Sequence, residues 1–357
     1  MAKVELIRYT SSLYNDTTTV KKVHFGSGVA AYHSRMKKLA LFTALSLLSG
    51  LQTSSAQSAK VTLGLGYIPN IQFAPFYVAL EQGYFKAEGF DVALEHGYAS
   101  QLLPLLLAGR IDYLVGDAED AVFARAQNQP LRYVLAMYQS LPVTLFSLSE
   151  KKISKLSDLK GKTIGIPGPF GSSYYALQSA LSKNKLTDQD VTLQTVGYAQ
   201  LEAVRSGKVD AALGFINNEP LTLKKSGVAV NTLSLSSFYP MVGNGVITTD
   251  KTLSNAASAK KFLRAIQKGI AFTVKNPQKA FEDSKKYVDK LDAGQLEVLN
   301  ASIPLMKSAY TAKNGLGFSD TGNWSRALSY LKNSGQLKSS LPSSAFYSNA
   351  YLQKGIQ

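Results

Sequence analysis

The sequence predicts an α/β fold of two lobes, joined by a hinge, with a ligand cleft between them. From Lys60 onward, short strand-like apolar segments alternate with helical segments, and a second series of the same kind begins near Pro142. Strands that alternate with helices form βαβ units whose strands run mainly parallel in one sheet. The chain of 357 residues, 45% of them apolar, is also long enough for two domains of ordinary size.

The first series of elements extends from Lys60 to Tyr138. Its opening strand alternates apolar and polar or small residues at period two, Pro75 suits the first turn of the next helix, and Gly83 suits the end of that helix. Asp117 is placed to cap a later helix. The predicted strands are 61–67, 90–94, 112–116 and 131–138, and the predicted helices are 74–82, 100–108 and 117–127.

The second series predicts strands at 143–146, 162–167, 191–196 and 209–214. Its predicted helices are 157–160, one that follows the turn at 168–173 and ends at 181, 199–206, and one that begins after 217. After 242–248 the pattern changes, and 257–330 is almost entirely helical. We therefore expect two crossovers, at 138–142 and 236–243. Lobe 1 would comprise 57–140 plus 243–357, whose helical part packs back on it, and lobe 2 would comprise 141–242.

The N-terminal region has the pattern of an export signal. Met36-Lys37-Lys38 is basic, 39–48 is uncharged and mostly apolar, and small residues precede Gln57. That apolar run is too short for a permanent membrane span of about 20 residues. We interpret 36–56 as a cleavable signal peptide and 1–35 as an over-extended, disordered start, the alternative being an unusually long basic region. The expected location is periplasmic or extracytoplasmic.

Composition excludes several functions. The absence of cysteine removes thiol catalysis, disulfides and a lipid-modified cysteine, so we expect no lipid anchor. Beyond residue 56, His96 is the only histidine, and we interpret it as a surface or loop residue. We therefore expect no catalytic residue, no metal and no cofactor. The net charge of +15 comes from scattered lysines with no basic stripe, which argues against nucleic-acid binding. We also expect a monomer.

Five segments that follow strand ends are rich in aromatic or amide groups: 67–77, 117–120, 168–175, 197–200 and 214–220. Ligands of such folds bind at the carboxyl ends of parallel strands, and two facing lobes form a cleft there. Each residue alone has a structural interpretation, as a core aromatic or a cap, but all five segments converge on one cleft. The predicted ligand-binding residues are Tyr67, Asn70, Phe73, Phe76, Asp117, Tyr138, Phe170, Ser172, Tyr174, Tyr198, Asn217, Asn218 and Glu219.

Four stretches, 69–79, 83–92, 155–162 and 207–212, resemble the SsuA/thiamine-pyrimidine-synthase-like family of periplasmic solute-binding proteins. The resemblance covers roughly 61–290. It implies a type II periplasmic-binding fold, a small-molecule ligand and the permease subunits of an ABC importer as partners. The fungal enzymes of this family depend on an active-site histidine and a cysteine cluster. This chain has neither, so we expect a binding protein and not an enzyme.

The class of ligand stays open on the sequence. Gly168–Ser173 could offer backbone donors to a sulfonate or nitrate. Against an anion, the first segment is aromatic and Glu219 places a carboxylate in the cleft. These features favour a planar heterocycle, for which each ring stack contributes about 0.5–1.5 kcal/mol beyond burial.

Within that class, the segments 72–77 and 217–220 resemble those of riboflavin-binding members of the family. A thiamine pyrimidine precursor is the alternative, although members that bind it usually have histidine at the place of Phe73. A different class is an enzyme that pairs carboxylates from Asp117, Glu119, Asp120 and Glu219.

Overall fold

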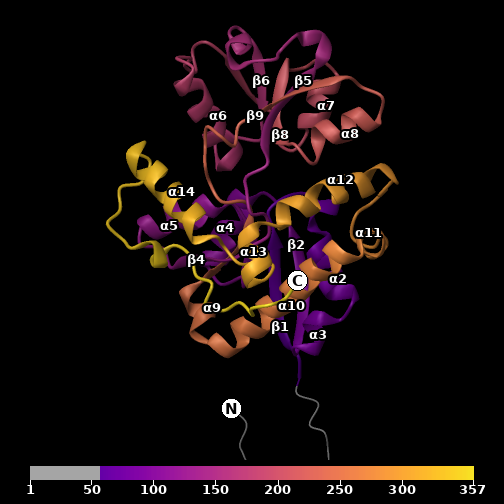
Figure 1. Ribbon diagram of the computed structural model, residues 1–357, viewed down its shortest axis with the longest axis vertical. Helices are drawn as coiled ribbons and strands as arrows, with labels where there is room; N and C mark the ends of the chain where they lie inside the picture. Colours follow the sequence, from indigo (N-terminus) through magenta and orange to yellow (C-terminus); the bar gives the residue numbers. More distant parts are fainter. Residues whose placement is uncertain (1–56) are drawn as a thin grey trace, which may run out of the picture. The chain divides into compact units, whose positions relative to one another are not determined.

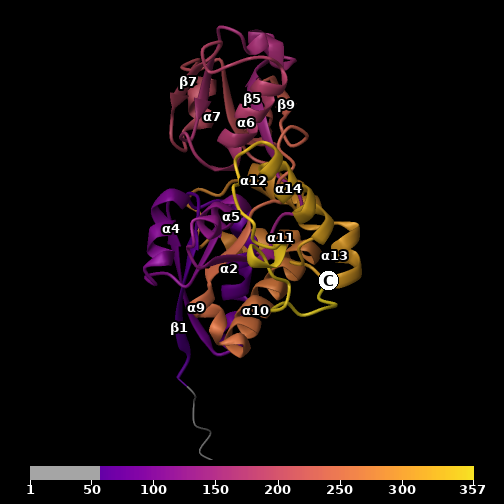
Figure 2. The ribbon, with the colours of Figure 1, turned by 90° about the vertical axis from the view of Figure 1, so that its left-hand side faces the viewer.

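The computed structural model describes residues 57–357, and the predictions made for 1–35 and 36–56 lie outside the described residues. The described chain forms two five-stranded sheets, each with helices on both faces (Figures 1 and 2). The predicted α/β fold is confirmed. Within residues 57–357, no helix combines the length and the apolar character needed to cross a membrane.

The first sheet, sheet A, has the strand order β2-β1-β3-β10-β4. Val61, Leu63 and Leu65 alternate along β1 and are buried in one apolar cluster with the helices on that face, as expected from the period-two pattern. The strands of sheet A are β1 (Ala59–Leu65), β2 (Phe90–His96), β3 (Tyr113–Gly116), β4 (Leu131–Ala136) and β10 (Gly245–Thr249).

Helices cover both faces of sheet A. One face packs on α2 (Ala74–Glu81), α3 (Tyr84–Ala87) and α10 (Ala256–Lys275), and α11 (Pro277–Ser284) lies against α2. The other face packs on α4 (Ala99–Leu107) and α5 (Ala118–Ala126). The remaining elements of this part are η1 (Ile71–Phe73), α9 (Asp250–Ser254), α12 (Gly294–Ser302), η4 (Ile303–Met306), α13 (Ala309–Asn314), α14 (Thr321–Asn333) and η5 (Ser343–Ala345).

The second sheet, sheet B, has the order β7-β6-β8-β5-β9. Leu177 of α6 is buried against one face, and Val204 of α7 and Leu223 of α8 are buried on the other. Its elements are β5 (Val143–Leu148), η2 (Ser149–Lys151), η3 (Leu156–Leu159), β6 (Thr163–Ile166), α6 (Gly171–Lys183), β7 (Thr192–Thr195), α7 (Gln200–Arg205), β8 (Ala211–Phe215), α8 (Glu219–Lys225) and β9 (Val230–Ser234).

Each sheet contains one strand that breaks the expected parallel arrangement. β10 runs antiparallel to β3 and β4, and β5 runs antiparallel to β8 and β9. Both are the first strands after the chain has passed from the other sheet. Such a strand starts at the edge where the parallel strands end, so it must run the opposite way. The edge strand β9 was not predicted from the sequence, because its residues are mostly half-buried and lack a clear apolar alternation.

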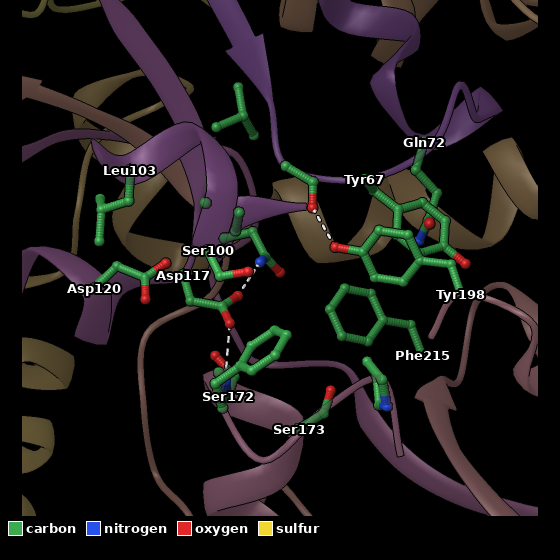
Figure 3. A pocket seen from close by; sticks show the side chains of 18 of the residues that line it. Tyr67, Gln72, Ser100, Leu103, Asp117, Asp120, Ser172, Ser173, Tyr198 and Phe215 are labelled. Carbon is green, nitrogen blue, oxygen red and sulfur yellow. Dashed lines mark hydrogen bonds between the residues drawn. The ribbon is translucent and has the colours of Figure 1, made fainter. Parts of the chain in front are cut away.

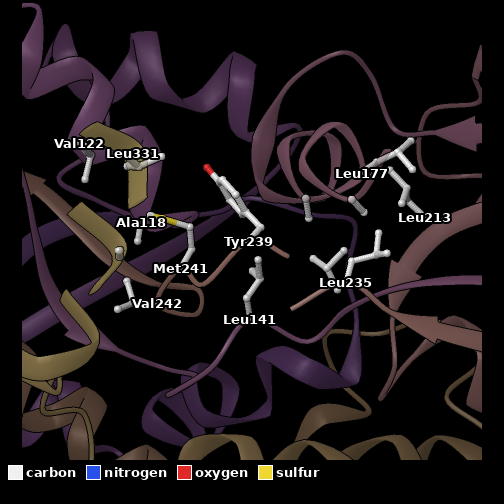
Figure 4. Close-up of a cluster of buried hydrophobic side chains, with 14 of the residues drawn as sticks. Ala118, Val122, Leu141, Leu177, Leu213, Leu235, Tyr239, Met241, Val242 and Leu331 are labelled. Carbon is white, nitrogen blue, oxygen red and sulfur yellow. The ribbon is translucent and has the colours of Figure 1, made fainter. Parts of the chain in front are cut away.

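The chain passes from sheet A to sheet B through 137–142 and returns through 235–244. Both segments carry buried apolar side chains, including Leu141, Leu235 and Tyr239. Figure 4 shows Tyr239 between Met241 on one side and Leu177 on the other, and all of these residues belong to one apolar cluster. The two lobes are therefore connected by packed side chains as well as by the backbone.

Candidate functional site

A cavity of about 390 Å³ lies between the two lobes, within the usual range of about 300–1,000 Å³ for small-molecule sites. It is formed at the carboxyl ends of strands from both sheets, as such folds favour. Figure 3 shows side chains from both lobes pointing into it. Its aromatic lining is Tyr67, Phe73, Tyr138, Phe170, Tyr198 and Phe215, and its polar lining is Gln72, Ser100, Asp117, Asp120, Ser172, Ser173, Gln200, Asn218, Glu219 and Asn244.

Glu219 connects the lobes at one side of the cavity. Its Oε1 accepts a hydrogen bond of 3.3 Å from the Tyr67 hydroxyl of lobe 1, and its Oε2 accepts one of 2.9 Å from the Phe215 N–H. Burial raises the pKa of Glu219 above its usual value. Asn218 stands at the N-cap of α8, but its side chain makes no capping hydrogen bond and instead lines the cavity. The side chain of Asn218 therefore does not cap α8.

Tyr198 forms a second contact across the cavity. Its hydroxyl donates to the backbone oxygen of Gly66 at 3.0 Å. Its ring lies 4.3 Å, between centroids, from Tyr67 and also 4.3 Å from Tyr98, against which it is stacked. Aromatic rings from both lobes thus meet at one wall of the site.

Asp117 forms the third contact. It occupies the N-cap position of α5, but its carboxylate does not cap that helix. Instead Oδ2 accepts from the N–H of Ser172 in lobe 2 at 2.8 Å, and Oδ1 accepts from the Asn244 side-chain amide. The predicted capping role is corrected, because the start of α6 offers this carboxylate an unpaired donor from the other lobe.

His96 is not a surface or loop residue, as the sequence had suggested. It ends β2, is half-buried, and both ring nitrogens are engaged. Nδ1 lies 3.0 Å from the Tyr67 oxygen and must donate, because a carbonyl oxygen can only accept, while Nε2 accepts from the Tyr77 hydroxyl at 3.2 Å. Burial lowers the pKa of His96, which favours this neutral form. His96 therefore holds the backbone of Tyr67 in place.

Nine of the predicted site residues line the cavity: Tyr67, Phe73, Asp117, Tyr138, Phe170, Ser172, Tyr198, Asn218 and Glu219. Asn70 and Phe76, from the first predicted segment, do not. The side chain of Asn70 caps η1 by accepting from the Gln72 N–H at 2.9 Å. Phe76 is fully buried in the apolar cluster beneath sheet A, on the inward face of α2.

Tyr174 and Asn217, from the lobe 2 segments, also lie outside the cavity lining. Tyr174 packs edge-on against Tyr175, with centroids 5.8 Å apart, on the core side of α6. Asn217 is buried and donates to the Ser302 hydroxyl of α12 at 2.7 Å. Neighbouring residues at a helix start point in different directions, so only some members of each segment reach the cavity.

Several lining residues were not predicted, among them Gln72, Gln200, Asn244 and Phe215. Gln72, Gln200 and Phe215 lie inside segments that the sequence had selected, so their position could have revealed them. Asn244 comes from the returning crossover, where nothing in the sequence indicates a site. Within residues 57–357, four buried polar side-chain atoms that belong to cavity-lining residues have no hydrogen-bond partner: Gln72 Nε2, Ser172 Oγ, Gln200 Oε1 and Asn244 Oδ1.

Among the described residues, the cavity lining has acidic side chains and no basic ones. Asp117, Asp120 and Glu219 contribute carboxylates, and none of the described residues that line the cavity is lysine, arginine or histidine. Burial and the neighbouring Asp117 raise the pKa of Asp120 to about 8. Within the described chain, no group of three or more histidine, aspartate or glutamate side chains is arranged to hold a metal ion. The cavity therefore suits an uncharged or cationic molecule with flat apolar faces.

Comparisons with known proteins show which chains are similar to this one. A family model described as NMT1/THI5 like matches residues 70–280. The riboflavin-binding protein RibY of Chloroflexus aurantiacus is 34% identical over 304 residues, which cover 83% of this chain and 87% of that protein. The formylaminopyrimidine-binding protein of Halalkalibacterium halodurans is 27% identical, with 83% and 92% covered. The periplasmic aliphatic sulphonate binding protein SsuA of Escherichia coli shares the fold, with a TM-score of 0.62 at 16% identity and 82% and 99% covered.

Proposed function

This chain belongs to the NMT1/THI5-like family, and we propose that it is the solute-binding component of an ABC importer that captures an uncharged aromatic heterocycle, riboflavin in the first place. A thiamine-type pyrimidine precursor is the second candidate. The ligand would occupy the cavity between the lobes and make contacts with both of them.

The observation that carries the proposal is that none of the described residues that line the cavity has a positively charged side chain. Three carboxylates and no basic side chain line it in the described chain. An anion moved from water into such a site would lose its hydration without gaining an opposite charge, which is strongly unfavourable. The sulfonate or nitrate alternative is therefore disfavoured, even though sulfonate-binding proteins share the fold.

The remaining lining supports a flat, hydrogen-bonding ligand. Phe215, Tyr198 and Tyr67 provide aromatic faces near one another (Figure 3). Gln72 and Gln200 contribute amide atoms that have no partner among residues 57–357. A heterocycle with ring nitrogens and carbonyl oxygens would satisfy these amides while its faces pack on the rings.

Two observations favour riboflavin over a pyrimidine: the sequence identities of the relatives and the presence of Phe73 in the cavity lining. The relative named for riboflavin is 34% identical, whereas the relative named for formylaminopyrimidine is 27% identical over a similar share of the chain. Phe73 lines the cavity where the resemblance implies histidine in pyrimidine-binding members.

An enzyme that uses paired carboxylates is the competing class. Both oxygens of Asp117 accept hydrogen bonds, as do both oxygens of Glu219, so these carboxylates are engaged in joining the lobes. Glu119 is fully buried and does not line the cavity. This arrangement favours binding over acid–base chemistry, and the sequence lacks the cysteine cluster that the resemblance attributes to the family's enzymes.

We infer the cellular context from the family and the N-terminal pattern. Export by the signal at 36–56 would place the mature chain outside the cytoplasm, where it would deliver its ligand to permease subunits. The structural relative SsuA of Escherichia coli is described as periplasmic.

Titration of ligand-free protein tests the proposed ligand. The purified chain is unfolded, separated from any carried-over small molecule and refolded, and the released fraction is identified by mass spectrometry. Riboflavin, a hydroxymethylpyrimidine and an alkanesulfonate are then titrated by calorimetry. We expect stoichiometric riboflavin binding, without turnover, and strong quenching of the flavin fluorescence by the stacked rings.

Two variants of one ring sharpen this test. Phe215→Leu removes an aromatic face but keeps apolar volume, so riboflavin affinity should fall by about 0.5–1.5 kcal/mol. Phe215→Tyr keeps the aromatic ring, so its affinity for riboflavin should fall by less than that of Phe215→Leu. Binding of only the sulfonate, or conversion of the flavin, would contradict the proposed function.

A further inference from the structure

The start of α6 in lobe 2 is already occupied by a carboxylate from lobe 1. α6 is 13 residues long and begins at Gly171, and no side chain of its own caps it. The Ser172 N–H at this start donates to Asp117 Oδ2 at 2.8 Å. Helix starts bind anions through free N–H groups and the helix dipole, so Asp117 occupies the place that an anionic ligand would take.

The backbone is shaped around this carboxylate. Gly171 has a φ of 77°, a conformation that other residues adopt rarely, and a Cβ placed there would lie 3.0 Å from Asp117 Oδ2. The other carboxylate oxygen accepts from the side-chain amide of Asn244. The two donors hold Asp117 in one position between the lobes.

A second observation indicates a ligand at this place. The side chain of Ser172 is only 1% exposed and lines the cavity, and its hydroxyl makes no hydrogen bond within residues 57–357, although the Asp117 and Glu119 carboxylates lie beside it. Asn244 Oδ1 also lines the cavity region without a partner in the described chain. These two atoms could respectively donate to and accept from a ligand hydroxyl.

We propose that Asp117 is a built-in anion that reserves this end of the cavity for an uncharged hydroxyl group of the ligand and rejects a phosphate or sulfonate. Asp117 is thus a specificity-determining residue. Ser172 Oγ and Asn244 Oδ1 form the hydroxyl subsite beside it, and Figure 3 shows Ser100 and Asp120 on the same side of the cavity. The inference rests on the proposed function only where it names the ligand as riboflavin, with its free hydroxyl, and not its phosphate ester.

The reason for this selectivity is both occupancy and charge. One of the α6 donors that a phosphate oxygen could use, the Ser172 N–H, is already bound to Asp117. The ligand phosphate would also lie beside the Asp117 carboxylate, where like charges repel because little water screens them. A hydroxyl meets neither obstacle, since it can donate to a carboxylate.

The first test uses inorganic sulfate as the probe, so that it does not depend on the identity of the ligand. Ligand-free protein is titrated calorimetrically with sodium sulfate at ionic strength held constant with sodium chloride. The wild-type chain should show no sulfate binding, whereas Asp117→Ala frees the Ser172 N–H and should bind sulfate at least tenfold more tightly. Asp120→Asn is the matched control: it removes a carboxylate of the same cavity without freeing α6, and should gain no sulfate binding.

The second test compares riboflavin with riboflavin 5′-phosphate. The wild-type chain should bind the phosphate ester at least a hundredfold more weakly, and the near-isosteric Asp117→Asn should narrow this ratio at least tenfold. Circular dichroism confirms that each variant is folded, and if Asp117→Ala does not fold, Asp117→Asn decides the question alone.

Three results would overturn the proposal: no gain of sulfate binding in folded Asp117→Ala, an equal gain in Asp120→Asn, or equal binding of both flavins by the wild-type chain. If no flavin binds the wild-type chain, the choice of riboflavin fails, while the sulfate comparison still decides the role of Asp117.

Discussion

At the scale of single residues, Glu219 both complements a helix start and accepts hydrogen bonds at the cavity. It stands in the first turn of α8, where a carboxylate complements the helix dipole. Its two oxygens nevertheless accept hydrogen bonds from the Phe215 N–H and, across the cavity, from the Tyr67 hydroxyl. A carboxylate has about four acceptor positions, so these contacts leave it able to accept from a ligand as well.

We expect Glu219→Gln to weaken riboflavin binding by about 1.5–3 kcal/mol, the range for hydrogen bonds to charged groups. The amide has one acceptor oxygen where the carboxylate has two, so it cannot serve both existing donors and the ligand. Calorimetry measures the effect, with Glu202→Gln as control, because Glu202 has a side chain 67% exposed and does not line the cavity. Unchanged affinity in a folded Glu219→Gln protein would contradict the assignment.

At the scale of elements, the close packing of α10 on α2 fixes the segment that precedes the cavity. α2 follows directly on Phe73, which lines the cavity, and α10 crosses it at Gly269. A Cβ built at Gly269 would lie 2.1 Å from the Pro75 oxygen and 3.0 Å from Ala79 Cβ. No larger residue fits there without moving one of the helices.

Gly269→Ala should therefore destabilise the protein, although alanine is the better helix former by about 1 kcal/mol. Overpacking of this kind costs about 1–3 kcal/mol, so the free energy of unfolding should fall in urea titrations. Lys261→Ala, at an exposed position on the same helix, should stay within about 0.5 kcal/mol of the wild type. Equal or greater stability of Gly269→Ala would show that the helices separate more easily than their contact indicates.

At the scale of the whole molecule, three carboxylates concentrated near the junction of the lobes control the response to pH. Burial raises the pKa values of Asp117, Glu119 and Asp120, that of Asp120 to about 8. When folding raises the pKa of an acid, the acid stabilises the native state fully at pH values below its pKa in the unfolded state. This stabilisation is lost as the pH rises through the pKa of the acid in the folded state. Deprotonation of the cluster thus costs folding free energy, because it places negative charge on buried groups that lie close together.

We therefore expect the melting temperature of ligand-free protein to fall between pH 7 and pH 9. In this window His96 is neutral in the folded state because burial lowers its pKa, and mostly neutral in the unfolded state because its ordinary pKa is about 6.5, so it adds little opposing slope. Differential scanning fluorimetry measures the trend, and Asp120→Asn should flatten it because Asp120 titrates near pH 8. A melting temperature that rises over this range, or an undiminished slope in the variant, would contradict this account.

The sequence by itself determined the alternation of strands and helices and the segments that meet at the cleft. Both are local properties: apolar periodicity sets the elements, and the connectivity of βαβ units places their strand ends at one edge. The single histidine beyond residue 56 and the absence of cysteine likewise limit the chemistry that the chain can perform, whatever its fold. The antiparallel strands β5 and β10 could not be foreseen in this way, because their direction follows from how the chain enters each sheet.

Only the tertiary structure decided which side chain of each segment faces the ligand. Phe73 lines the cavity while Phe76, three residues later, is core, and Ser172 lines it while Tyr174 packs inward. The rotation of each helix start against its sheet selects between such neighbours, and that rotation depends on packing with residues distant in the chain. The same holds for Asp117: its position in the sequence predicts a local cap, but its carboxylate accepts instead from the Ser172 N–H of the other lobe and from the Asn244 side-chain amide.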